Sequence, residues 1–123
     1  MKITTRTIGN CKVLDCHGPI TIGSATETLR QAVREAIQDG TSKVILNLRK
    51  MRKVDACGLG ELINSYIHVK NQGAKLVFLN LSRNIKRLLT LAKLLPLFEI
   101  YDDEQKALEG CEQHDAQLEK EEQ

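Results

Sequence analysis

The stretch Val-Asp-Ala-Cys-Gly-Leu-Gly-Glu-Leu, residues 54–62, joins a strand-like segment to a helix-like one. An apolar run at 44–48 precedes it, and a basic loop at 49–53 lies between. Asp55 stands where its carboxylate can accept a hydrogen bond from a backbone N–H of the first helical turn. Cys57 then falls in that turn, where free N–H groups and the helix dipole favour negative charge. Because open α/β sheets place function at such strand–helix junctions, residues 54–62 are the candidate site.

Strand-like and helix-like segments alternate on both sides of this junction. Two strands flank a Gly9-Asn10 hairpin turn, and each later strand is followed by a helix long enough for a crossover. This order predicts one α/β domain with a mostly parallel sheet, one antiparallel N-terminal edge strand and about four helices. The expected strands are 2–8, 12–17, 43–48, 75–79 and 97–101, and the expected helices are 24–38, 57–71, one from Asn80 or Ser82 to 95, and one opening at Asp102.

The helices carry apolar residues at helical spacing, which predicts the faces that they bury. Ser24 with Glu27 three residues on has the spacing of a capping box at the first helix. Pro96 is expected to end the third helix. The predicted inward residues are Leu59, Leu62, Ile63, Tyr66 and Ile67 in the second helix, Ile85, Leu88, Leu89, Ala92 and Leu95 in the third, and Ala107, Leu108 and Cys111 in the last.

Composition indicates a soluble, cytoplasmic protein. The 123 residues are 41% hydrophobic and 28% charged, with a net charge of +2, and the N-terminus has no signal-peptide core. Residues 112–123 hold five acids and one base, a net of −4, which leaves +6 on the rest. We therefore expect a domain at 1–111 and an acidic, disordered tail at 112–123. Scarce aromatic residues argue against nucleic-acid binding by base stacking, and no apolar run suits membrane insertion.

The four cysteines form no Cys-x-x-Cys pair, so neither a zinc site nor a thioredoxin motif is indicated, and no cofactor or metal is expected. Cys11 and Cys16 lie five positions apart on one predicted strand and should face opposite sides of the sheet. Reduced thiols are therefore the default expectation for all four.

The junction also resembles a known signature. Residues 55–60 are similar to the Asp-Ser-Ser-Gly-Leu-Gly sequence of STAS domains, the family of bacterial anti-sigma factor antagonists. Asp55, Gly58, Leu59 and Gly60 match, whereas Ala56 and Cys57 occupy the two serine positions. The opening hairpin, Gly-Pro-Ile-Thr at 18–21 and Leu-Leu-Thr-Leu-Ala-Lys-Leu-Leu-Pro-Leu-Phe-Glu-Ile-Tyr at 88–101 extend the resemblance to about residue 111.

The resemblance implies a non-enzymatic module that binds an anti-sigma factor or a kinase-like ATPase in a partner-switching pathway. In the family the second serine is phosphorylated, so Cys57 implies a member that is not phosphorylated at the usual site. Thr21 replaces a usual aspartate in the loop after the second strand, and Asn47 stands where many members have aspartate. The partner-binding residues implied by the resemblance are Thr21, Ser24, Asp55, Ala56, Cys57, Gly58 and Leu59.

Two other functions fit the sequence, and a third, an enzyme, does not. One is a STAS subunit of a larger assembly, such as a lipid-transport ATPase or a stressosome-like particle. Another is a thiol-based sensor, because a cysteine at a helix N-terminus can have its pKa lowered below about 8.5; the alternative is that Cys57 merely substitutes for serine. An enzyme with Cys57 as nucleophile lacks an identifiable base and orienting residue. The partner's identity and the oligomeric state are not encoded in any recognisable motif.

Further features have two readings each. The basic loop at 49–53 is either solvated or faces an acidic partner or a phosphate beside the helix N-terminus. Four apolar residues near the third helix form either an exposed patch or helix-end packing: Leu91, Leu94, Leu97 and Phe98. The three histidines, His17, His68 and His114, are scattered and are expected to be structural or exposed.

Overall fold

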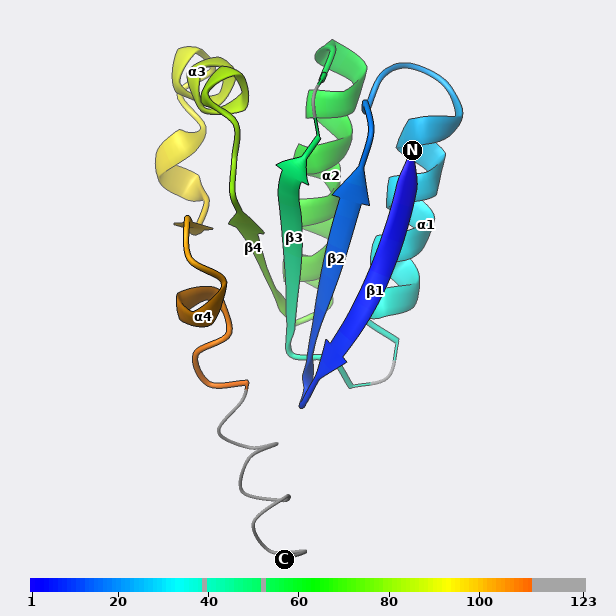
Figure 1. The fold of residues 1–123 in the computed structure, drawn as a ribbon, viewed down its shortest axis with the longest axis vertical. Helices are drawn as coiled ribbons and strands as arrows, with labels where there is room; N and C mark the ends of the chain where they lie inside the picture. The colour runs from blue at the N-terminus through cyan, green and yellow to red at the C-terminus, as the bar shows by residue number, and fades with distance from the viewer. Residues whose placement is uncertain (39, 52, 112–123) are drawn as a thin grey trace, which may run out of the picture.

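A computed structural model describes residues 1–38, 40–51 and 53–111. Its five strands form one sheet in the order β1-β2-β3-β4-β5, in which β1 is antiparallel to β2 and the remaining neighbours are parallel (Figure 1). The predicted α/β class, with one antiparallel edge strand, is confirmed. The strands are β1 Lys2–Ile8, β2 Cys11–His17, β3 Lys43–Lys50, β4 Lys75–Leu79 and β5 Ile100–Tyr101.

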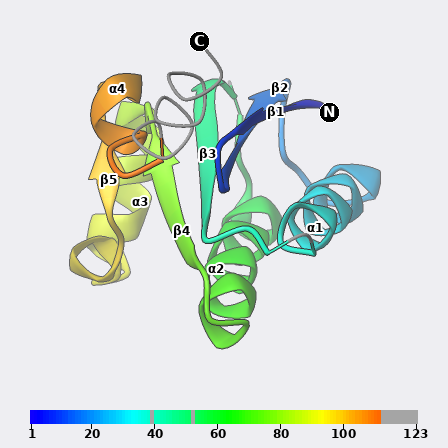
Figure 2. The ribbon, with the colours of Figure 1, turned by 90° about the horizontal axis from the view of Figure 1, so that it is seen from below.

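The two faces of the sheet are covered by different numbers of helices. Three helices, α1, α2 and α3, pack on one face, while the short α4 lies on the other (Figure 2). Their bounds are α1 Ser24–Ala36, α2 Ala56–Asn71, α3 Arg83–Leu91 and α4 Glu104–Ala107, with a 3₁₀ helix, η1, at Leu95–Leu97. Within the described ranges, no helix combines the length and the apolar character that crossing a membrane requires.

Alternating side chains of the strands supply two apolar clusters. Val44, Leu46 and Leu48 of β3 face α1, α2 and α3 in the main core, whereas Ile45 faces the α4 side. Successive strand residues point to opposite faces, so β3 can be buried on both. The predicted division of β2 is also confirmed, because Cys16 lies in the main core and Cys11 in the cluster beneath α4.

The cluster beneath α4 contains a disulfide, which the sequence did not lead us to expect. Cys11 at the start of β2 is bonded to Cys111 after α4, with the two Cα atoms 5.8 Å apart. The expectation of reduced thiols is therefore wrong for this pair, whereas Cys16 and Cys57 are free. Cys16 is buried, and this burial raises the pKa of its thiol to about 12.

A row of polar side chains crosses the face of the sheet that α4 covers, near the carboxyl ends of the parallel strands. Arg6 pairs with Asp15 at 2.7 Å and with Glu104 of α4 at 2.6 Å, and Asn47 donates to Asp15 at 2.8 Å. The amide of Asn80 donates to Asn47 at 3.1 Å. Burial alone would raise the pKa of Asp15, but the hydrogen bonds from Arg6 and Asn47 lower it below its usual value. This network fixes α4 against β1.

The first helix begins differently from the prediction. Its N-cap is Gly23, and Ser24 is the first helical residue, so the predicted capping box of Ser24 and Glu27 is wrong. Gly23 has φ 114°, a left-handed conformation that glycine adopts without steric cost. The hydroxyl of Thr26 donates to the Gly23 carbonyl at 2.9 Å, whereas no capping side chain accepts from the N–H groups of the first turn.

Several predicted boundaries near the C-terminal half also shift. Of the two proposed caps of α3, Ser82 accepts the hydrogen bond, from the Ile85 N–H at 3.1 Å. The helix ends at Leu91 rather than 95, because Lys93 turns the chain at φ 61°. The last strand is only Ile100–Tyr101, and the cap of α4 is Asp103 rather than Asp102. The predicted acidic tail lies outside the described residues.

Candidate functional site: the junction of α2 with the loop after β2

The candidate site lies at the carboxyl end of the sheet, where the loop after β2 meets the start of α2. Ile20 forms an isolated parallel bridge with Val54. Its N–H donates to the Lys53 carbonyl at 2.8 Å, and its own carbonyl accepts from the Asp55 N–H at 3.3 Å. Two segments more than thirty residues apart in sequence are thereby held together as one surface.

Asp55 links the two segments through its side chain. Its Oδ1 accepts from the Gly58 N–H at 2.8 Å, which is the helix cap predicted from the sequence, and its Oδ2 accepts from the Ile22 N–H at 2.9 Å. Hydrogen bonds from two backbone N–H groups lower the pKa of the Asp55 carboxyl, because they stabilise its charged form. The Gly58 N–H has the larger effect and the Ile22 N–H the next largest. Asp55 thus caps α2 and positions the Ile22 loop.

Gly58 lets the two segments come close. A Cβ atom at this position would lie 2.2 Å from the Ile20 carbonyl oxygen and 2.9 Å from its carbonyl carbon. No side chain fits there unless the backbone moves. The match of Gly58 to the family signature therefore has a physical cause in this chain.

The seven predicted partner-binding residues do not share one degree of exposure. Ala56 and Cys57 are exposed in the first turn of α2, and Ser24 is exposed at the start of α1. Leu59 is half-buried and packs against the main core, while Gly58 is buried. The structure therefore divides the set into surface positions and residues that support them; the half-buried Thr21 and Asp55 complete it.

Sequence reasoning missed Ile22, which stands beside these positions and is 76% exposed. The available signal was an apolar residue in a short loop between a strand and a helix, a place where polar residues are usual. Of the four apolar residues for which the sequence allowed either an exposed patch or helix-end packing, Leu91 and Leu97 are exposed, whereas Leu94 and Phe98 pack against the main core.

Two cations of the basic loop, Arg49 and Lys50, lie in a strand rather than in a loop. β3 extends through Lys50, so Arg49 and Lys50 belong to the strand, and they line a cavity of about 220 Å³ together with His17 and Asn47. Across the described residues, no group of three or more His, Cys, Asp or Glu side chains is placed to hold a metal ion. His114 falls outside the described residues.

The family model of the STAS domain matches residues 2–107, so the chain belongs to the STAS domain family. Among curated proteins, an anti-sigma F factor antagonist of Paenibacillus polymyxa is 27% identical over 88 residues, covering 71% of this chain and 75% of that protein. An anti-sigma factor antagonist from Mycobacterium paratuberculosis has a similar structure, with a TM-score of 0.74 and 18% identity. The match covers 89% of this chain and 92% of that chain. The Bacillus cell fate determinant SpoIIAA in its phosphorylated form has a TM-score of 0.69 and 18% identity, and the match covers 87% of this chain and 96% of that chain. This protein is thus an anti-sigma factor antagonist-like STAS domain.

The Asp55 cap makes stability depend on pH in a defined direction. Because the folded-state pKa lies below the unfolded value of about 3.9, the carboxylate stabilises the fold above that pH, and the contribution is lost as pH falls through the folded pKa. We expect Asp55→Asn to melt at a lower temperature than wild type at pH 7, with the gap closing towards pH 3. Thermal unfolding followed by circular dichroism measures this.

Asp102→Asn is the matched control, because Asp102 is exposed and its ion pair with Lys86, at 3.6 Å, lies on the surface. This control should melt within about 2 °C of wild type at pH 7. An Asp55→Asn gap of equal size at pH 7 and pH 3 would show that the carboxylate charge does not stabilise the junction.

Proposed function

We propose that this chain docks an anti-sigma factor or a kinase-like ATPase through the face formed by the loop after β2 and the first turn of α2. The observation that carries the proposal is the exposed Cys57 in that first turn, on a surface that Asp55 ties to the Ile22 loop. Curated and structural relatives are named as anti-sigma factor antagonists, which supports this partner class. Such a partner acts on cytoplasmic transcription, so the proposed setting is the cytoplasm.

The chemistry of the face suits protein docking. Ile22 offers an exposed apolar anchor, and Ala56 and Cys57 are small enough to let a partner approach the helix closely. Hydrogen bonds to Asp55 hold the loop and the helix in one arrangement, so little ordering is needed on binding. Catalysis is not part of the proposal, because no base contacts the Cys57 thiol in the hydrogen bonds of the described residues.

The second part of the proposal concerns control. A phosphate on a serine at this position would add about −1.5 to −2 charges at the helix N-terminus. SpoIIAA has been solved in phosphorylated and unphosphorylated forms. This chain presents a thiol instead of a hydroxyl, so we propose that it stays in the unmodified, docking-competent state.

A negative charge placed at Cys57 should therefore block docking. Cys57→Asp adds one charge in the first turn of α2, where the helix dipole tolerates it, so the fold should keep its melting temperature. We expect the affinity for the partner ATPase to fall at least about tenfold, as for a like-charge or desolvated group at an interface. The partner is first identified by mass spectrometry after co-purification, and the affinity is then measured by calorimetry with both purified proteins.

Gln105→Glu is the control, because it adds the same charge to the first turn of α4 on the opposite face of the sheet. It should bind as wild type does. With ATP and the partner, Cys57→Ser should gain one phosphate by intact mass, while wild type gains none. Equal binding of Cys57→Asp and wild type, or phosphorylation of wild type, would overturn the proposal.

A further inference from the structure

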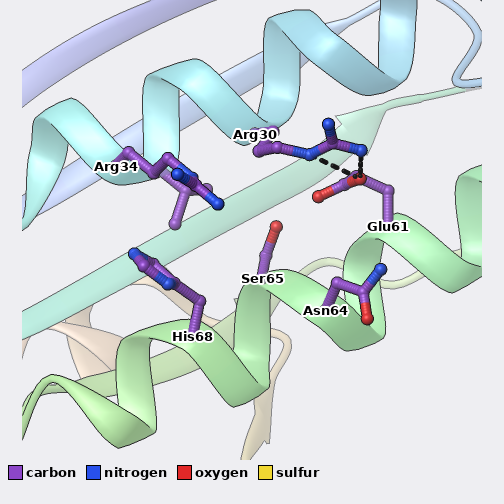
Figure 3. A pocket seen from close by; sticks show the side chains of 7 residues that line it. Arg30, Arg34, Glu61, Asn64, Ser65 and His68 are labelled. Carbon is purple, nitrogen blue, oxygen red and sulfur yellow. Dashed lines mark hydrogen bonds and ion pairs between the residues drawn. The ribbon is translucent and has the colours of Figure 1, made fainter.

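A second pocket lies between α1 and α2, well away from the docking face. Its cavity measures about 210 Å³ and opens between the facing sides of the two helices (Figure 3). Ser65, on its floor, follows Cys57 by eight residues, which is about 12 Å along a helix axis. We call this cavity the α1–α2 pocket; its lining is Arg30, Val33, Arg34, Glu61, Asn64, Ser65 and His68.

Ser65 has a buried hydroxyl that makes no hydrogen bond to the described residues. Only 3% of its surface is exposed, and its hydroxyl oxygen has no hydrogen-bond partner among the described residues. Serine within a helix commonly bonds the carbonyl one turn earlier, but Ser65 does not. Its hydroxyl points from α2 towards α1, into the space between Glu61, Arg34 and His68 (Figure 3). A buried hydroxyl without a partner is unfavourable, so its orientation suits a group that enters the pocket.

Glu61 is a buried carboxylate of which only one oxygen accepts hydrogen bonds among the described residues. It is 4% exposed, and both of its hydrogen bonds from Arg30, at 3.2 and 2.7 Å, go to the same oxygen, Oε1. Figure 3 shows the second oxygen turned away from Arg30 and towards the pocket. A carboxylate accepts several hydrogen bonds, so this oxygen can take one from a donor in the pocket.

Arg34 adds a positive charge one helical turn beyond Arg30. No ion pair or hydrogen bond of its side chain occurs among the described residues, and it projects from α1 beside His68 (Figure 3). The two arginines and Glu61 leave a formal charge of +1 around the cavity. A planar guanidinium matches a carboxylate with two parallel hydrogen bonds.

We propose that the α1–α2 pocket binds a small hydroxycarboxylate. Its carboxylate would pair with Arg34 and accept from the Ser65 hydroxyl, and its own hydroxyl would donate to Glu61. The single negative charge balances the +1 of the lining, whereas a phosphate dianion would leave one unbalanced negative charge beside the Glu61 carboxylate. The cavity volume is that of roughly seven water molecules in the liquid, which is enough room for an acid of two or three carbon atoms.

The test is a titration of the full chain, labelled with ¹⁵N, with L-lactate, D-glycerate, acetate and orthophosphate, followed by amide chemical shifts. We expect the two hydroxy acids to shift the amides of 30–34 and 61–68 in a saturable manner. Acetate, which lacks the hydroxyl, and orthophosphate should bind at least tenfold more weakly. Tighter binding of orthophosphate, or shifts that rise linearly with every anion, would overturn the assignment.

Variants separate binding from folding. Ser65→Ala removes a hydroxyl that has no partner, so the fold should be at least as stable while the affinity for lactate falls about tenfold. Arg34→Gln should have a similar effect on affinity, and Arg83→Gln, an exposed arginine of α3 outside the pocket, should have none. Unchanged lactate affinity in both Ser65→Ala and Arg34→Gln would show that the ligand does not use this pocket.

Discussion

Gly58→Ala is expected to destabilise the protein by about 3 kcal/mol or more, because overpacking against backbone cannot be relieved by a rotamer change. The added Cβ would stand 2.2 Å from the Ile20 carbonyl oxygen, so either α2 or the Ile20 loop must move. Movement of the loop also breaks the bridge between Ile20 and Val54 and the hydrogen bond from Ile22 to Asp55. Thermal unfolding should show a melting temperature lower by about 10–15 °C.

Gly60→Ala is a close control, two residues further along the same helix. Apart from its chain neighbours and the backbone of its own helical turns, no atom lies within 4 Å of a Cβ built there, so the substitution should raise stability by about 0.5–1 kcal/mol through helix propensity alone. A Gly58→Ala protein as stable as Gly60→Ala would mean that the loop does not press on the helix. The contrast isolates the contact with Ile20 from the general effect of replacing glycine.

The second large effect concerns the disulfide. Loss of the bond between Cys11 and Cys111 should lower the free energy of unfolding by about 2–4 kcal/mol, because the closed loop spans nearly the whole domain. The bond also holds the end of α4 against the sheet, where Ala107 and Leu108 are buried. Urea unfolding of wild type with and without reductant, and of Cys111→Ser, measures the change in midpoint.

Cys57→Ser serves as the control for this experiment, since Cys57 is an exposed free thiol. Its midpoint should respond to reductant as that of wild type does, whereas Cys111→Ser should not respond at all. Identical midpoints of wild type with and without reductant, together with four titratable thiols in denaturant, would show that the pair is not bonded in solution.

Local patterns in the sequence were enough to predict the order of elements and the Asp55 cap. The cap depends only on residues three apart, and the strands of the parallel sheet are apolar runs of suitable length. The disulfide could not be found in this way, because Cys11 and Cys111 are separated by 100 positions and meet only once α4 has packed on the sheet. Ile22 was missed for a similar reason, since its position depends on a loop held by another segment.

The buried face of α2 shows where apolar periodicity misleads. Ile67 was expected in the core but is exposed, whereas Glu61 and Ser65 are buried. Hydrophobic spacing finds the face that meets the sheet, but α1 covers a second side of α2, and polar residues lie there. The pair of Arg30 with Glu61 became recognisable only from the contact between the two helices. The candidate pocket could therefore not be predicted from the sequence.

The antiparallel direction of β1 affects where a reporter or affinity handle can be attached. Met1 lies beside Gly18, at the same end of the molecule as the beginnings of α1 and α2, and it packs against the main core (Figure 1). Cys111, in contrast, is anchored to the start of β2 at the opposite end. A fluorescent protein joined ahead of Met1 would crowd the proposed docking face, whereas one joined directly after Cys111 would leave that face open.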